Sequence, residues 1–283
     1  MIKVLSSGFY ASIQDLGRNG YRSIGVPSSG SMDSYSATLA NVLLGNRENE
    51  AIIEVFFGGV RLLFLEACYL CISGADFSVT LDKSLIKLNV PFWAPKGSEL
   101  RFGKRKFGAR TYLGVKGGIQ TRSILGSKSS YQGITSSVKL EKEMLLSIDP
   151  DAVHKIDRKR GVLKSPSAHF LTEEIPCFKG PEFELLTEEQ QSILLSKKYT
   201  ISGDHNRMGY RLREKVFNHF DSMLTSAVLP GTVQLTPSGE LVVLMRDCQV
   251  TGGYPRVLQL SEEGINRLAQ KTTNDSLRFL PKG

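Results

Sequence analysis

Cysteine and histidine are scarce in this sequence, which has four of each among 283 residues. So few cysteines exclude a disulfide-bonded scaffold. Cys68 and Cys71 form a C-x-x-C pattern, but they lie in the apolar stretch Leu62–Ile72, which is typical of strands. Residues three apart on a strand point to opposite faces, and Cys177 and Cys248 are isolated. We therefore predict buried, reduced thiols and no metal site.

Long hydrophobic runs are also missing. The longest, such as Leu241–Met245, fall far short of the about 20 residues that cross a bilayer. The first residues, Met1–Leu5, begin no apolar core of a signal peptide and precede no small-residue cleavage site. We expect a cytoplasmic protein with no membrane partner.

Acidic residues are outnumbered, because 36 Lys and Arg residues accompany 28 Asp and Glu residues and give a net charge of +8. The densest basic clusters are Arg101–Arg110 and His154–Lys164. Neither matches the aromatic-and-basic pattern of single-strand binders, and no known nucleic-acid motif is present. We expect both clusters to be solvated loops, the first at a hairpin tip, and we expect no nucleic-acid partner.

Common catalytic motifs are absent as well. The sequence contains neither the G-x-S-x-G elbow of hydrolases nor the H-E-x-x-H of metalloproteases. The loop Gly126–Ser129 lacks the second glycine and the spacing of a phosphate-binding Walker A loop. Any activity must therefore depend on other residues.

Short strands separated by glycine-containing turns make up most of the chain. The predicted strands are Ile52–Phe56, Val60–Leu65, Tyr69–Ile72, Phe77–Leu81, Thr111–Val115, Met144–Ile148, Leu241–Met245 and Val257–Leu260. The predicted helices are Ser34–Leu44, Thr187–Ser196 and Ser261–Gln270. Gly45 ends the first helix, and a capping box from Thr187 to Gln190 begins the second. The pattern indicates a mainly β fold with a few short helices.

A polar, basic stretch at about residues 150–172 is the best linker in the sequence, and a new series of elements begins near Lys179. One short segment before this linker is similar in sequence to a segment after it, and we refer to this similarity as the internal echo. Arg18–Arg22 and Arg207–Arg211 agree at four of five positions, which hints at a duplication.

Three polar, glycine-rich segments carry most of the candidate chemistry. They are residues 14–33, Gly203–Arg211 and Asp247–Pro255. Glycine allows the backbone to approach a ligand closely, and arginine suits carboxylates and phosphates. If the segments converge, they form a pocket for an anionic or amide-bearing small molecule. Each segment could instead be a turn in which arginine pairs with aspartate.

Family motifs are spread almost end to end through the chain. They are Gln14–Arg18 (Q-D-x-G-R), Gly25–Asp33 (G-V-P-x-S-G-x-M-D), Leu39–Asn46, Ser73–Asp76, Tyr112–Gly118, Leu125–Ser127, Asn206–Leu212 and Gln249–Pro255. With these motifs the sequence resembles the carboxyltransferase-type family called allophanate hydrolase subunit 2. This family is also known as the KipA-like proteins or as the C subunit of 5-oxoprolinase.

The resemblance implies one carboxyltransferase unit over residues 1–283, built from two cyclophilin-like β-barrel lobes at about 1–165 and 175–283. The N-terminal segment is a candidate for sharing between the lobes. The implied function is that of the C subunit of an ATP-dependent 5-oxoprolinase, which converts 5-oxo-L-proline to L-glutamate. The implied partners are a KipI-like B subunit and a LamB/YcsF-type A subunit, and the ATP site is on, or shared with, another subunit.

The candidate site residues combine this resemblance with the chemistry of anion and amide binding. As catalytic residues we expect the anion clamps Arg18 and Arg207, together with Asp15, Asp33 and Asp247 as bases or arginine orienters. As substrate-binding residues we expect Gln14, Ser29, Asn206, Gln249, Thr251, Gly252, Gly253 and Tyr254.

Two alternatives remain open. The first is a biotin-dependent carboxyltransferase subunit of the urea carboxylase type, with biotin carried by another protein. The second is a KipA-type regulator that binds and antagonises a KipI-like kinase inhibitor without catalysis. The absence of biotin carboxylase segments and of an M-K-M biotinylation signature favours the 5-oxoprolinase function.

Overall fold

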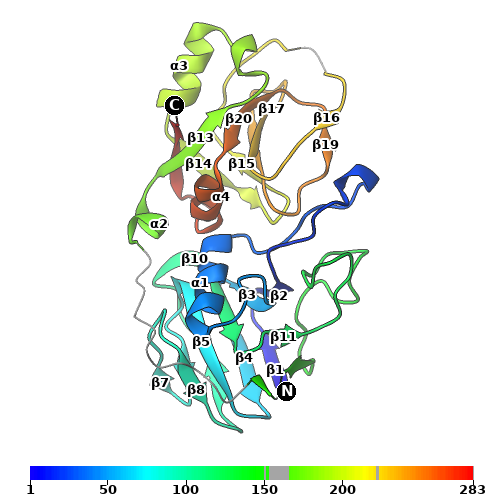
Figure 1. Ribbon diagram of the computed structural model, residues 1–283. Helices are drawn as coiled ribbons and strands as arrows, with labels where there is room; N and C mark the ends of the chain where they lie inside the picture. The colour runs from blue at the N-terminus through cyan, green and yellow to red at the C-terminus, as the bar shows by residue number, and fades with distance from the viewer. Residues whose placement is uncertain (150, 153–165, 221–222, 283) are drawn as a thin grey trace. The chain divides into compact units, whose positions relative to one another are not determined.

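Strands dominate the computed structural model, which describes residues 1–149, 151–152, 166–220 and 223–282 (Figure 1). The predicted fold class, mainly β with a few short helices, is confirmed. The chain divides into two units. Unit 1 comprises Met1–Arg18 and Ser29–Pro166, and unit 2 comprises Asn19–Ser28 and Ser167–Gly283. The chain therefore leaves unit 1 after Arg18 and returns to it at Ser29.

Unit 1 contains two antiparallel sheets. One has the order β11-β12-β1-β4-β9-β6-β7, and the other has the order β2-β3-β10-β5-β8. The strands are β1 Ile2–Ser7, β2 Tyr10–Gln14, β3 Ile52–Phe56, β4 Val60–Phe64, β5 Cys68–Asp76, β6 Thr80–Leu81, β7 Ser84–Leu85, β8 Phe92–Ala94, β9 Glu99–Arg101, β10 Phe107–Val115, β11 Ile119–Gln120 and β12 Leu145–Ile148.

The core of unit 1 follows the period-two pattern of these strands. Alternate residues of β4, Val60, Leu62 and Phe64, are fully buried in one hydrophobic cluster that also draws on both sheets. Cys68 lies in that cluster, whereas Cys71 packs in another cluster with residues of helix α1. The two thiols therefore lie on opposite faces of β5, as their spacing predicts.

Helix α1, Ser34–Leu44, has the predicted bounds and packs across β5 and β10 (Figure 1). Asp33 caps its N-terminus by accepting a hydrogen bond from the backbone N of Ser36, and Gly45 ends it in the left-handed region at φ 69°. Gly114 on β10 admits the helix because it has no side chain, and an added Cβ there would lie 3.0 Å from Leu44.

Unit 2 is built on a closed barrel with the order β13-β20-β17-β18-β15-β14-β21. The parallel pairing of β13 with β21 is one of its ladders, and β16 and β19 form a separate small sheet. The strands are β13 Glu174–Lys179, β14 Tyr199–His205, β15 Gly209–Leu212, β16 Ser226–Ala227, β17 Thr232–Leu235, β18 Leu241–Leu244, β19 Thr251–Gly252, β20 Arg256–Leu260 and β21 Ser276–Pro281.

The helices of unit 2 are α2 Ala168–Leu171, α3 Glu188–Ser196 and α4 Glu262–Ala269. Short 3-10 turns occur at Arg22–Ile24 and Phe183–Leu185. The capping box predicted at Thr187 and Gln190 is present, with both reciprocal hydrogen bonds formed. Ser261 caps α4 by accepting a hydrogen bond from the backbone N of Gly264, and α4 packs on β13 and β20.

Two local predictions are corrected. The stretch Phe77–Leu81 is a strand only at Thr80–Leu81, because Ser78 has φ +48° and donates its backbone N–H to Asp76. The basic cluster Arg101–Arg110 is exposed at Lys104 to Lys106 but is not a hairpin tip. It connects β9 of one sheet to β10 of the other, and these strands do not pair.

Other predictions concern the linker and the internal echo. Most of the linker at 150–172 and of the basic cluster His154–Lys164 lies outside the described residues. The echoed segments differ in structure, since Gly209 begins strand β15 whereas residues 19–21 form no strand. No helix in the described part of the chain has the length and apolar character needed to cross a bilayer.

Candidate functional site

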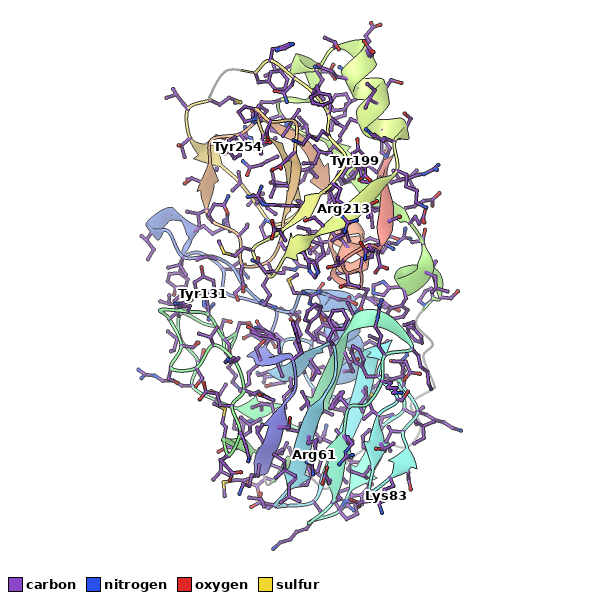
Figure 2. The ribbon with its side chains drawn as sticks, turned by 180° about the vertical axis from the view of Figure 1, so that it is seen from behind. Arg61, Lys83, Tyr131, Tyr199, Arg213 and Tyr254 are labelled. Atoms are coloured by element: carbon purple, nitrogen blue, oxygen red, sulfur yellow. The ribbon has the colours of Figure 1, made fainter. Side chains whose placement is uncertain are left out.

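The second and third glycine-rich segments meet at a cavity of about 790 Å³ in unit 2. The cavity is bordered by the end of β14, by β15 and by the turn between β17 and β18. Its lining residues are Gly203, Asp204, His205, Asn206, Met208, Gly209, Arg211, Gln234, Thr236, Pro237, Ser238, Glu240, Val242, Leu244, Gln249 and Tyr254. Figure 2 shows Tyr254 close to the small β16–β19 sheet.

Three carboxamide side chains line this cavity. The Oδ1 atom of Asn206 accepts hydrogen bonds from the backbone N atoms of Met208, at 2.7 Å, and Gly209, at 3.3 Å. These bonds fix the side-chain orientation of Asn206. Gln234 is 2% exposed and donates from Nε2 to the carbonyl of Tyr254 at 3.3 Å. Gln249, the third carboxamide, is exposed.

Gly252 leaves room for Gln234. A Cβ atom at Gly252 would lie 2.6 Å from Nε2 of Gln234, well inside normal contact distance. The predicted site residues Thr251, Gly252 and Gly253 do not themselves line the cavity. Thr251 and Gly252 form β19, which pairs with Ala227 and Ser226 of β16. Their backbone thus supports the wall that carries Gln234 and Tyr254.

Charged groups of both signs lie at the cavity. Arg211 and Glu240 form an ion pair, with Nη1 and Oε2 3.0 Å apart, and both side chains are more than a third exposed. The Nε2 atom of His205 lies 3.0 Å from Oγ1 of Thr273. The His205 ring packs at 5.0 Å from the ring of Tyr210. The cavity therefore offers one cation, two carboxylates and an imidazole beside the carboxamides.

This set of groups can recognise an amide. A carboxamide presents one donor group and one acceptor, so it can pair with the C=O and N–H of a ligand amide at once. Arg211 adds a planar group that binds a carboxylate through two N–H donors. Donors placed at an amide oxygen also stabilise the negative charge that builds up there when a nucleophile attacks the carbon.

The predicted anion clamp Arg207 is paired with the predicted orienter Asp247. Nε of Arg207 donates to Oδ2 of Asp247 at 2.8 Å, and Nη2 donates to Oδ1 at 3.0 Å. The two side chains are 11% and 12% exposed. Both residues stand next to the cavity segments but are not among its lining residues. The pair ties the loop before β15 to the loop after β18, since the backbone N of Asp247 also donates to the Arg207 carbonyl.

The remaining predicted site residues belong to unit 1. Asp15 is 7% exposed, and its carboxylate accepts four hydrogen bonds. The donors are the backbone N atoms of Gly17 and Lys128 and the hydroxyls of Ser127 and Ser129, at 2.6–2.8 Å. Asp15 therefore holds the 127–129 loop against the end of β2. This arrangement also shows why Gly126–Ser129 is not a phosphate loop: its Lys128 N–H is directed to a carboxylate.

Arg18, Gln14 and Ser29 are buried around the same part of unit 1. Arg18 is 1% exposed and donates from Nη2 to the Ser129 carbonyl at 2.5 Å. Gln14 is fully buried and donates to the Ser12 hydroxyl at 2.9 Å. Ser29 has φ +56° and precedes Gly30, where an added Cβ would lie 2.9 Å from the backbone N of Gly17. Close backbone packing thus joins the points where the chain leaves and re-enters unit 1.

Asp33 takes part in a buried network that begins at its helix cap. Its backbone N donates to the hydroxyl of Tyr112 at 2.7 Å, and that hydroxyl donates to Oε2 of Glu54 at 2.9 Å. Burial, and then the nearby Glu54 carboxylate, raise the pKa of Tyr112 well above its usual value. Arg110 lies 3.8 Å from Glu54, which balances part of the buried negative charge.

Sequence reasoning missed several cavity residues, above all Gln234 and Glu240. Gln234 lies within an otherwise buried strand, and a buried carboxamide among apolar neighbours was the signal that could have found it. Glu240 directly follows Ser238-Gly239, and such a glycine-containing turn between two strands gives no signal of a binding residue. Within the described ranges, no group of three or more His, Cys, Asp or Glu side chains is placed to hold a metal ion.

The chain matches one family model and is similar to several known proteins over almost its whole length. The family model described as carboxyltransferase domain, subdomain A and B, matches residues 24–281. The C subunit of the Escherichia coli 5-oxoprolinase is 29% identical over 99% of this chain and 91% of its own length. The protein of the same name from Haemophilus influenzae is 29% identical over 99% of this chain and 90% of its own length. The crystal structure of the K. lactis urea amidolyase superposes with a TM-score of 0.89 at 28% identity, over 100% of this chain but 19% of that one.

Proposed function

Because this chain belongs to the family of carboxyltransferase domains, subdomain A and B, we propose that it is the C subunit of an ATP-dependent 5-oxoprolinase. The complex converts the cyclic amide 5-oxo-L-proline to L-glutamate and acts in the cytoplasm. The observation that carries the proposal is the unit 2 cavity, where three carboxamides and one arginine surround a space of about 790 Å³. That space accommodates a small ligand with one amide and one carboxylate.

The substrate's groups match the lining residues one by one. Asn206 and Gln249 would donate to the ring carbonyl, and Gln234 would hold the ring N–H. Arg211 would bind the carboxylate, exchanging part of its pairing with Glu240. A five-membered amide is a poor electrophile, so donors at its oxygen lower the barrier to ring opening. His205 contributes an imidazole to the cavity, a group that can serve as a general acid or base.

The share of each relative's length that the chain matches supports a role in 5-oxoprolinase over a role in urea carboxylation. The two 5-oxoprolinase subunits match over nine-tenths of their own length, whereas the chain spans 19% of the urea amidolyase. The second candidate, a biotin-dependent carboxyltransferase subunit, is favoured by one observation. Urea and the ureido group of biotin are also amides, and the same carboxamides can bind them.

Partners and ATP follow from the proposed complex. We propose a KipI-like B subunit and a LamB/YcsF-type A subunit as partners. ATP supplies the driving force for opening the ring. The Gly126–Ser129 segment does not suit the phosphates, because Asp15 accepts hydrogen bonds from Ser127, from Ser129 and from the Lys128 backbone. We propose that the nucleotide binds on, or is shared with, another subunit.

Reconstitution tests the proposal. The chain is mixed with its KipI-like and LamB/YcsF-type partners, each is omitted in turn, and ADP and glutamate are measured with 5-oxoproline as substrate. We expect both products only when all three proteins are present. Turnover that needs biotin carboxylase and urea instead would establish the carboxyltransferase alternative. Full activity without this chain would refute a role in catalysis.

A further inference from the structure

A second cavity, of about 450 Å³, lies within unit 1. It is covered by the loop that joins β11 to β12, on which Figure 2 shows Tyr131. Its lining residues are Ile13, Ile119, Gln120, Thr121, Arg122, Ile124, Lys128, Ser130, Ile134, Thr135, Ser136, Ser137, Lys139, Leu140, Met144, Leu145, Leu146 and Ser147. None of the residues assigned to the proposed reaction is among them.

The charged side chains that line this cavity are all basic. Arg122, Lys128 and Lys139 line it, and no acidic side chain does. Lys128 lies 3.8 Å from Glu50, which stands outside the lining. Arg122 and Lys139 have no ion pair or side-chain hydrogen bond with other residues in the described part of the chain. Two cations at the cavity therefore have no counter-charge among the described residues.

The loop is held in place by buried contacts rather than by the cations. Asp15 accepts the backbone N–H of Lys128, and the backbone N of Ser130 donates to the Ile13 carbonyl at 2.9 Å. At the far end, the backbone N of Leu140 donates to the Ala11 carbonyl at 2.7 Å. The cavity is thus preformed, which reduces the entropy lost when a ligand binds.

Its walls combine two kinds of surface. Ile13, Ile119, Leu140 and Leu146 are at most 8% exposed and form an apolar wall. Hydroxyl groups stand beside the cations on the loop; they belong to Thr121, Ser130, Thr135, Ser136 and Ser137. Hydroxyls and unpaired cations favour an anionic head group, and the apolar wall favours a hydrocarbon or aromatic body.

From this geometry we infer that the unit 1 cavity binds a small organic anion whose phosphate or carboxylate head faces Arg122, Lys128 and Lys139. The body of the ligand packs on the isoleucine and leucine wall. The lining of this cavity shares no residue with that of the carboxamide cavity of unit 2. The anion site is therefore separate from the proposed substrate site, and its test does not depend on the proposed function.

Three matched probes test the inference on the full-length chain. Phenyl phosphate and benzoate share an aromatic body and differ in their anionic head, and benzyl alcohol carries the same body without charge. Binding is followed by isothermal titration calorimetry and by chemical shifts of the 121–147 amides in NMR spectra. The test variant is Arg122→Gln combined with Lys139→Gln. The control is Lys142→Gln, which removes one exposed positive charge on the same loop but outside the lining.

We expect saturable binding of at least one anionic probe, weakened at least about tenfold in the double variant and unchanged in Lys142→Gln. Phosphate or carboxylate preference then identifies the head group. Three results would overturn the inference: no saturation by either anion, equal binding of benzyl alcohol, or affinity unaffected by the double variant. Because both changed residues are exposed, thermal unfolding of the variant should match that of the wild type.

Discussion

The guanidinium of Arg207 and the carboxylate of Asp247 form two parallel hydrogen bonds, at 2.8 and 3.0 Å, across forty residues of sequence. The pair is nearly buried, and it joins the loops on which Asn206 and Gln249 stand. Its geometry makes it a support for the unit 2 cavity. An anion that reached Arg207 would have to compete with a carboxylate already in place.

Asp247→Ala should lower the free energy of unfolding by about 3 kcal/mol, because it leaves a nearly buried guanidinium without its counter-charge. The matched control is Glu240→Ala, which breaks the exposed pair with Arg211 and should cost at most about 1 kcal/mol. Urea denaturation measures both values. Equal losses in the two variants would contradict the supporting role assigned to the Arg207–Asp247 pair.

Gly252→Ala should impair turnover of the reconstituted complex about tenfold or more while the chain still folds. The added Cβ would lie 2.6 Å from Nε2 of Gln234 and displace a cavity-lining carboxamide. Gly203→Ala is the control, since that glycine also lines the cavity but has open space around its Cβ position. Similar kinetics for the two variants would remove Gln234 from the proposed site.

Arg211→Gln should lower kcat/KM for 5-oxoproline by about tenfold to a hundredfold, the usual effect of losing a charge-assisted hydrogen bond. Arg213→Gln should leave it unchanged, because Arg213 bonds Asn274 and is not part of the cavity lining. Steady-state kinetics distinguish the two. If the two variants behave alike, the carboxylate of the substrate binds elsewhere.

Asp15→Asn should lower the free energy of unfolding by about 2–4 kcal/mol, because an amide accepts fewer of the four hydrogen bonds now made to the carboxylate. Hydrogen exchange should accelerate at the amides of Lys128 and Ser129, which measures release of the loop. A variant of unchanged stability and protection that nonetheless lost activity would instead indicate the catalytic base expected from the sequence.

Thiol titration should depend on folding. Burial raises the pKa of Cys68, Cys71 and Cys177 to about 12 and that of Cys248 to about 11. Unfolded thiols ionise near pH 9, so their contribution to stability is complete below that pH and disappears as the pH rises through 11 to 12. At about pH 8, below these pKa values, a disulfide reagent such as dithionitrobenzoate should label all four thiols in urea and react only slowly with the native chain. Rapid native labelling would contradict the burial.

Local patterns predicted those parts of the fold in which local energetics dominate. Helix α1 and strand β3 have the predicted bounds because a cap, a glycine stop and a short buried run each act over neighbouring residues. The parallel ladder of β13 with β21 was not predicted, since it joins residues about a hundred positions apart. No local signal marks such a pairing.

For the candidate site, too, local sequence patterns predicted some residues and could not predict the roles of others. Asn206, Gln249 and Tyr254 were predicted and lie together at the unit 2 cavity, because loop residues between glycines often line ligand sites. The roles of Asp15 and Asp33 could not be read from sequence. A carboxylate that caps a helix or holds a loop looks the same in sequence as one that transfers protons. Only the hydrogen-bond donors around it, Ser36 for Asp33 and Lys128 for Asp15, distinguish the two.

Residues 19–28 belong to unit 2 although they lie between two parts of unit 1, and this affects the order in which unit 2 can form its contacts during synthesis. Arg22, in that segment, donates to the carbonyls of Val228 and Gln249, which are synthesised more than two hundred residues later. The first-made segment of unit 2 can therefore form these hydrogen bonds only after the chain has been made as far as Gln249. A cut between the units near residue 166 would not yield a self-sufficient unit 2, because residues 19–28 of unit 2 lie on the other side of that cut, between two parts of unit 1.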